Sequence, residues 1–215
     1  MKRRAILAAL GSGYGVVAGC LAEDGNPTTD NPGGADGSDD VPDDSVAGNF
    51  DEVDRPECEV TAETVDVTVG DEVEAHETAA TVPYPDPAET VDSDEFLAYV
   101  EDFDHAYVTH NVLCDRNGSG RILSISHTVK EAEPFDWYDD IHVIFLLRVA
   151  GTSAGVDAEG YMWVTDIAPT GVVYAIDETG IARAAFDKAG TYSPDEYEDN
   201  APDPLESGTL VGTFF

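Results

Sequence analysis

Residues 93–113 combine a long apolar stripe at helical spacing with start and stop signals, and so define one helix around which the rest of the chain must fold. The stripe consists of Phe96, Tyr99, Val100, Phe103, Ala106 and Tyr107. Asp92 stands at the N-cap position and Glu95 at the third helical position, a capping-box arrangement. The Gly-rich residues 117–120 end the segment. Because a helix of this kind buries one face, other residues must supply the surface that covers the stripe.

The residues that follow the helix show a succession of β-strand patterns. Residues 121–132 alternate polar and apolar side chains, whereas residues 141–150 are apolar on both faces and fit the centre of a sheet covered on both sides. The other predicted strands are residues 63–69, 72–80, 161–164, 172–176, 181–186 and 209–215. Residues 172–176 and 181–186 form a hairpin in which Gly180 suits a left-handed turn position. These elements predict an α+β fold, with one long helix packed on a curved, mostly antiparallel sheet.

Between residues 90 and 190, the order of one helix followed by a meander of antiparallel strands resembles the cystatin-like and nuclear-transport-factor-like folds. The resemblance rests on the order of the elements and not on a motif. It implies, as an expectation, a pocket between the helix and the sheet. It does not specify a function, because one fold carries many functions.

The first 20 residues have the three parts of an export signal: a basic start at residues 2–4, an apolar run over residues 5–19, and small residues directly before Cys20. The apolar run is shorter than the roughly 20 residues that a membrane-spanning helix needs. Residues 3–7 resemble the twin-arginine export motif, and residues 17–20 resemble a lipobox. The second resemblance implies that Cys20 becomes a lipidated N-terminus; the alternative is an ordinary signal peptide that happens to contain a cysteine.

We therefore divide the chain into a signal peptide at 1–19, a lipidated acidic tether at 20–56 and a single α+β domain at 57–215. The tether is rich in Gly, Pro, Asn, Ser and Asp, so it buries too little apolar area to offset its ordering entropy, and we expect disorder. About 160 residues remain, enough for one hydrophobic core. This arrangement predicts a protein held by an N-terminal lipid on the extracellular face of the cell membrane.

Acidic residues outnumber basic ones by 45 to 10, which gives a net charge of −35 at pH 7. In dilute buffer this charge opposes compaction, whereas in molar salt the Debye length falls to roughly 3 Å and the repulsion is screened. The balance resembles that of proteins from salt-loving archaea, and with the export signal it implies a haloarchaeal lipoprotein. It argues against nucleic acid as a partner, because phosphates would be repelled. A calcium-binding surface is the alternative interpretation, but the sequence has no calcium loop with a closing glutamate.

Two cysteines, Cys58 and Cys114, remain once Cys20 is assigned to the lipid. Outside the cell we expect them to form a disulfide that joins the start of the domain to the end of the helix; the alternative is a pair of free, buried thiols. Asn117 begins the one acceptable glycosylation sequon, in a predicted exposed turn, and is the candidate glycosylation site.

His127 is the candidate catalytic residue. If the hairpin after the helix pairs Val129 with Phe145, His127 lies opposite Leu147 on the apolar face. There it could be an acid–base group in a pocket or, as is more common, a core histidine bonded to a backbone carbonyl. A slip of one residue would move it to the other face.

Trp137, Tyr138 and Asp139 are candidate ligand-binding residues in a predicted loop. Aromatic faces beside carboxylates can bind sugars or cations; the alternative is that the rings fold back onto the hairpin. Tyr174 and Arg183 lie near each other across the last predicted hairpin, and we interpret them as a structural pair. We cannot assemble four side chains with the geometry of a zinc site, and we expect neither a metal nor a cofactor.

The sequence contains no Gly-x-Ser-x-Gly nucleophile elbow and no Gly-rich phosphate loop after a strand. We therefore expect a non-catalytic binding or interaction domain at the cell surface, whose partner is a small ligand between helix and sheet or a surface protein. The alternative is a small-molecule hydrolase or isomerase that uses His127 and a nearby carboxylate in the same cavity.

Overall fold

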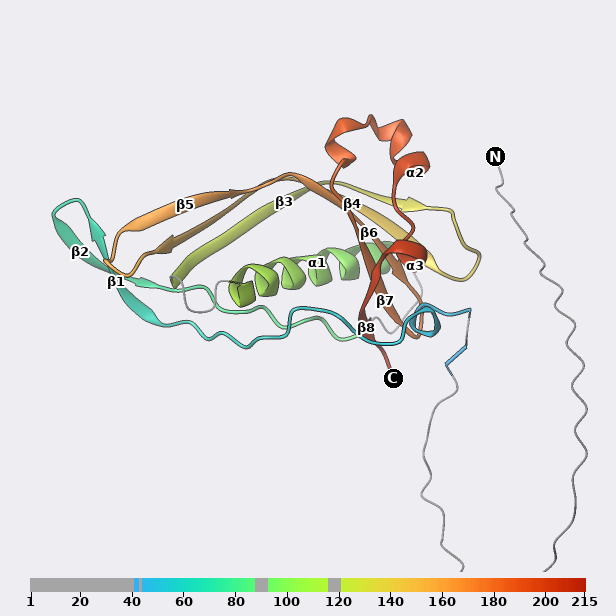
Figure 1. Ribbon diagram of the computed structural model, residues 1–215, viewed down its shortest axis with the longest axis horizontal. Helices are drawn as coiled ribbons and strands as arrows, with labels where there is room; N and C mark the ends of the chain where they lie inside the picture. The colour runs from blue at the N-terminus through green and yellow to red at the C-terminus, as the bar shows by residue number, and fades with distance from the viewer. Residues whose placement is uncertain (1–40, 43, 88–92, 116–120) are drawn as a thin grey trace, which may run out of the picture. The chain divides into compact units, whose positions relative to one another are not determined.

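The computed structural model of this chain describes residues 41–42, 44–87, 93–115 and 121–215. These residues belong to one compact unit with the bounds Asp39–Phe215 (Figure 1). The predicted signal peptide at 1–19, the lipidation site Cys20, the sequon residue Asn117 and the N-cap residue Asp92 lie outside the described residues. Within the described part of the chain, no helix is both long enough and apolar enough to cross a membrane.

The α+β fold class predicted from the sequence is confirmed. The longest helix in the described residues is α1 (Ser93–Asp115). The strands are β1 (Thr64–Val69), β2 (Glu72–Glu77), β3 (Arg121–Phe135), β4 (His142–Val156), β5 (Met162–Ile167), β6 (Thr170–Ile176), β7 (Gly180–Phe186) and β8 (Thr209–Thr213). The short helical turns are η1 (Ala47–Asn49), η2 (Ala189–Thr191), η3 (Pro194–Glu196), α2 (Tyr197–Asn200) and α3 (Pro204–Ser207).

The strands form two antiparallel sheets, and β4 pairs with three other strands of the larger one. The smaller sheet pairs β1 with β2. In the larger sheet the strands lie in the order β3-β4-β6-β7-β8, and β5 pairs with β4 beyond the end of β6. Residues 142–148 of β4 pair with β6, whereas residues 151–156 pair with β5. The larger sheet therefore forks where β4 changes partner.

α1 packs on one face of the larger sheet through the stripe that the sequence predicts (Figure 1). Its buried side chains include Phe96, Val100 and Phe103. They lie in one cluster with sheet residues Ile144, Leu146, Val172, Tyr174, Ile176, Ile181 and Val211. The helix predicted over 93–113 is thus confirmed, and it owes its position to the burial of one face.

The opposite face of the sheet is covered by two segments that lie far apart in the sequence. Apolar side chains from residues 46–50 and 189–205 pack there. Val46 is fully buried, and its N–H donates to Asp177 Oδ2 at 2.8 Å. The last part of the predicted tether, 20–56, therefore belongs to the folded unit, and the domain begins before residue 57. A few apolar side chains dock this polar segment because a sheet face lies open beside it.

The burial of consecutive β4 residues confirms its predicted central place. Val143, Phe145 and Leu147 lie in the apolar cluster on the face opposite α1. Ile144 and Leu146 lie in the cluster beneath α1. A strand that is apolar on both faces is thus buried on both faces.

The register of β3 against β4 differs from the one that we considered from the sequence. Glu133 lies opposite Phe145, where we had placed Val129, and His127 lies opposite Gly151. The pairing shifts because β3 continues beyond its predicted end and shortens the connecting loop. Further along the pair the register shifts three times, twice with an extra residue on β3 and once with an extra residue on β4. Sequence alternation cannot locate these bulges, because each adds a residue to one strand only.

Cys58 and Cys114 form a disulfide, as predicted, with 5.7 Å between their Cα atoms. The bond ties the segment before β1 to the last turn of α1. On the chain-entropy model, closing a loop of this length stabilises the fold by roughly 4 kcal/mol.

The β6–β7 hairpin forms as predicted, but Gly180 acts there in a different way. Gly180 is not among the glycines with positive φ, so the predicted left-handed conformation is wrong. A Cβ at this position would lie 2.6 Å from the Gly212 carbonyl oxygen of β8. Glycine is therefore required for the close approach of β8, while Asp177 shapes the turn by accepting a hydrogen bond from the Gly180 N–H.

Candidate functional site

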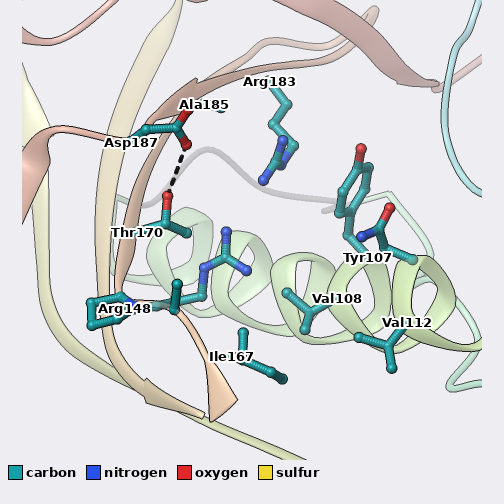
Figure 2. Close-up of a pocket in the computed structure, with 12 residues that line it drawn as sticks. Tyr107, Val108, Val112, Arg148, Ile167, Thr170, Arg183, Ala185 and Asp187 are labelled. Carbon is teal, nitrogen blue, oxygen red and sulfur yellow. Dashed lines mark hydrogen bonds between the residues drawn. The ribbon is translucent and has the colours of Figure 1, made fainter. Parts of the chain in front are cut away.

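A pocket of about 490 Å³ lies between α1 and the strands of the larger sheet, at the fork of that sheet (Figure 2). One wall is the connection from β5 to β6, and α1, β4 and β7 supply the others. The lining residues are Tyr107, Val108, Asn111, Val112, Arg148, Ile167, Ala168, Pro169, Thr170, Arg183, Ala185 and Asp187. The pocket exists because β4 leaves β6 and turns to β5, which opens the sheet beside the last turns of the helix.

Regular spacing brings the lining side chains together. The α1 residues fall on one side of the helix, at i, i+1, i+4 and i+5: Tyr107, Val108, Asn111 and Val112. Arg183 and Ala185 lie two residues apart on β7 and so share a face. Asp187 continues that face directly after the strand. The helix and strand periods thus determine which side chains line the pocket.

Arg148 lies at the fork and carries a buried positive charge. It is the last β4 residue that pairs with β6, opposite Thr170. The residue is only 6% exposed. Its Nε lies 3.6 Å from Asp104 Oδ2, which is an ion-pair distance, and it has no hydrogen-bond partner among the described residues. At least one donor of this buried guanidinium is therefore unused.

Asp104 supplies the buried negative charge next to the pocket. It is fully buried on α1, and Tyr174 Oη donates to its Oδ1 at 2.8 Å. Its Oδ2 accepts no hydrogen bond from the described residues, although His127 Nε2 lies 3.9 Å away. Burial and the charge of Asp104 raise the pKa of Tyr174 well above its usual value, so the hydroxyl keeps its proton. The Asp104 carboxylate thus lies against the guanidinium group of Arg148, the imidazole of His127 and the phenol of Tyr174.

Arg183 connects this cluster to the far wall of the pocket. Its Nε donates to Tyr174 Oη at 3.3 Å, and Tyr174 and Arg183 are direct partners across the β6–β7 hairpin, as predicted. Its guanidinium carbon lies 4.3 Å from the centre of the Tyr107 ring, a cation–π contact. A chain of polar contacts therefore runs from Arg183 through Tyr174 and Asp104 to Arg148.

His127, the candidate catalytic residue, lies beside Asp104 but is not one of the lining residues. Its side chain is 5% exposed, and its ring centroid lies 5.2 Å from that of His105. Burial lowers the pKa of His127, while the charge of Asp104 opposes this shift, so the neutral imidazole is favoured. The structure brings this histidine next to a carboxylate, Asp104, that the sequence analysis did not identify.

The candidate ligand residues Trp137, Tyr138 and Asp139 lie away from the pocket. Trp137 and Tyr138 pack against the apolar cluster on the sheet face opposite α1. Tyr138 Oη donates to Asp203 Oδ2, and Asp139 is exposed. Both rings therefore fold back onto the core, which is the alternative that we considered for this loop.

One group in the described residues could present three metal ligands: Cys58, His110 and Cys114. The two sulfurs are joined in the disulfide, and His110 Nε2 donates to the Val82 carbonyl at 2.9 Å. A thiolate is the form of cysteine that binds metals, so the oxidised pair offers no such ligand.

Sequence reasoning missed Asp104 and Arg148 as site residues, although each carried a signal. Asp104 follows Phe103 within the apolar stripe of the helix, and Arg148 interrupts the run of residues that is apolar on both faces. An ionised side chain in such a place must be compensated, so each predicts a partner.

Comparisons with protein-family models, with curated proteins and with solved structures gave no match to this chain.

Proposed function

We propose that this chain is an exported lipoprotein of a salt-loving archaeon, held by Cys20 on the extracellular face of the cell membrane, whose folded domain binds a small molecule. The pocket between α1 and the sheet, with Arg148 and Arg183 in its wall, carries the binding proposal. Its volume of about 490 Å³ lies within the range of small-molecule sites, roughly 300–1,000 Å³. The predicted export signal supports the location, and the acidic composition supports the salt-loving source.

The side chains of the pocket favour binding over chemical conversion. Among the described residues, those that border it include no histidine, cysteine or serine. Asp187, the carboxylate of the wall, lies exposed and accepts a hydrogen bond from Thr170 Oγ1 at 3.3 Å. A hydroxyl nucleophile needs an adjacent base, and an exposed carboxylate that water solvates is a weak base for this purpose.

One observation favours the second candidate, a small-molecule hydrolase or isomerase. His127 Nε2 lies 3.9 Å from Asp104 Oδ2, and an imidazole beside a carboxylate is a common acid–base arrangement. Such an enzyme needs a substrate to reach a side chain that is 5% exposed. In that case His127→Gln abolishes conversion of the substrate, whereas a binding domain keeps its ligand affinity.

A surface protein is the alternative partner. Large apolar side chains are exposed on or beside β1, β2 and β5: Val69, Val73, Tyr161, Met162 and Val164. Thr68 of β1 forms an isolated bridge with Tyr161, so these residues gather at one end of the domain. Apolar groups that stay exposed in this way are typical of contact surfaces.

The binding proposal is tested by thermal unfolding of the full-length chain carrying Cys20→Ser, in molar KCl, with neutral, anionic and cationic small molecules. A ligand of the pocket should raise the melting temperature. Val112→Trp puts an indole into the pocket wall and should abolish this rise. Val73→Trp, at an exposed position on β2, is the matched control and should keep it. A rise that survives Val112→Trp would place the ligand elsewhere.

The anchoring proposal needs a separate experiment in cells. Cys20→Ser should release the protein to the medium or leave an uncleaved precursor, because the acceptor of the lipid is lost. Fractionation and mass spectrometry of the N-terminus measure both outcomes. An acylated, membrane-bound protein that persists in the variant would contradict the lipobox assignment.

A further inference from the structure

We propose that the ligand of this pocket is a small monocarboxylate with an apolar body, whose carboxylate is held by Arg148 and Arg183. This inference rests on the proposed binding function and names its ligand class. Positive charge is scarce in this chain, with 10 basic residues against 45 acidic ones. The described part of the chain contains four arginines, and two of them line this one pocket.

The two guanidinium groups share one space. Figure 2 shows Arg148 entering the pocket from β4 and Arg183 from the side of β7, with their guanidinium groups on facing sides. Arg148 is 6% exposed, and its Nε lies 3.6 Å from Asp104 Oδ2 without a hydrogen bond. The Nε thus faces Asp104, and the end of the guanidinium group is the part that points toward the pocket (Figure 2). A carboxylate suits this group, because its two oxygens match the donor fork of a guanidinium.

The charges around the arginines favour an acceptor with a single negative charge. Asp104 is fully buried and compensates for one guanidinium. Asp187 lies exposed, where water screens it, and Tyr174 and His127 present neutral side chains. One positive charge therefore stays uncompensated at the pocket. A monoanion balances it, whereas a dianion such as hydrogen phosphate would bring an excess of buried negative charge.

The remainder of the pocket is suited to an apolar body. Its uncharged, mainly hydrocarbon wall consists of Val108, Val112, Ile167, Ala168 and Pro169. The Tyr107 ring adds an aromatic surface that is already fixed by its contact with Arg183. About 490 Å³ leaves room beside the carboxylate for a body of roughly ten carbon atoms. The ligand is thus amphipathic, with its charge toward the sheet fork.

The test compares three probes by calorimetry on the full-length Cys20→Ser chain in molar KCl: octanoate, octanol and inorganic phosphate. Octanoate and octanol share an apolar body, so their difference isolates the carboxylate. We expect octanoate to bind at least about tenfold more tightly than octanol, and phosphate to bind more weakly than octanoate. Equal affinities of octanoate and octanol, or tighter binding of phosphate, would overturn the proposed ligand class.

Variants separate this inference from the binding function itself. Arg183→Gln should raise the Kd of octanoate about tenfold and leave that of octanol unchanged. Arg121→Gln removes an exposed arginine at the start of β3 and is the charge-matched control, with no expected change. If Arg183→Gln unfolds the domain, Asp104→Asn combined with Arg148→Gln removes a charge pair without leaving either partner alone. This double variant should also raise the Kd of octanoate relative to that of octanol, because one of the two guanidinium contacts is lost.

The two proposals fail in different ways. If a neutral or cationic molecule binds in a manner that Val112→Trp abolishes, while octanoate does not bind, the ligand class is wrong and the binding function stands. If no molecule, octanoate included, responds to Val112→Trp, the binding function itself is wrong.

Discussion

The two faces of the larger sheet are built from different kinds of side chain. On the face opposite α1, the fully buried Phe145 packs against the rings of Phe135, Phe186 and Tyr197, with centroids 4.7–5.9 Å apart. On the α1 face, apolar packing near the start of the helix gives way to charged groups and a pocket near its end. Along β4, the inward residues beneath the helix change from aliphatic to Arg148 at this point.

This difference indicates which buried side chains the fold requires for stability and which it does not. A buried ion pair such as Asp104–Arg148 is often no more stabilising than apolar side chains of similar volume. The opposite face is sealed mainly by apolar side chains. The charges on the α1 face are therefore not needed to seal the sheet, which agrees with the binding role that we propose for them.

The largest expected effect is the unfolding of the whole domain, which would disrupt both faces of the larger sheet at once. The net charge of −35 repels itself when salt is diluted from molar concentration, where the Debye length is about 3 Å, to 0.1 M, where it is about 10 Å. We expect the domain to unfold in this dilution, measured by circular dichroism with KCl titrated. Hydrogen exchange should show both faces losing protection at the same salt concentration. A melting temperature that stays constant in dilute buffer would contradict the screening argument.

Phe145→Ala should give the next largest effect, on the face of the larger sheet opposite α1. The side chain is fully buried among aromatic rings, so its loss leaves a cavity and lowers the free energy of unfolding by about 4 kcal/mol. Denaturant titration in molar KCl measures this change. Phe215→Ala is the control, because Phe215 is 68% exposed and its loss should change the free energy by less than about 0.5 kcal/mol. Ligand affinity in the pocket should be unaffected at temperatures where Phe145→Ala stays folded.

Asp104→Ala, on the α1 face, should lower the free energy of unfolding somewhat less, by about 3 kcal/mol. The change leaves Arg148 without its carboxylate and Tyr174 Oη without its acceptor. The double variant Asp104→Asn with Arg148→Gln should lose less than the single one, because no buried charge is left alone. A loss below about 1 kcal/mol in the single variant would mean that Asp104 does not compensate Arg148.

Much of the fold could be predicted because it depends on local patterns. The period of residues 93–113 specified α1 and its buried face, and the doubly apolar run at 141–150 specified the central strand. The Cys58–Cys114 bond followed from a count of cysteines once the lipid site was assigned. These predictions need no knowledge of register, since the period is a local property and the cysteine count is a property of the composition.

The site could not be predicted because it depends on register and on long-range docking. Which polar residues meet is decided by the β3–β4 register, which has irregularities on both strands, and by the fork at Arg148. Neither leaves a periodic signal. By composition, residues 46–50 resemble the rest of the predicted tether, yet they pack on the face of the larger sheet opposite α1. The lipobox, the export route, the glycosylation of Asn117 and the cystatin-like resemblance stay predictions.

The smallest expected effect is a pH dependence that belongs to the α1 face alone. Burial lowers the pKa of His127 below 6.5, with Arg148 and His105 acting in the same direction and Asp104 against it. Below pH 6.5 the unfolded chain therefore binds a proton at His127 that the folded domain resists, so the free energy of unfolding falls as the pH falls through this window. His127→Gln should make this decline shallower in denaturant titrations below pH 6.5. Equal slopes in the parent and in His127→Gln would show that the histidine is as easily protonated in the folded domain as in the unfolded chain, and would contradict the assignment of this pH dependence to His127.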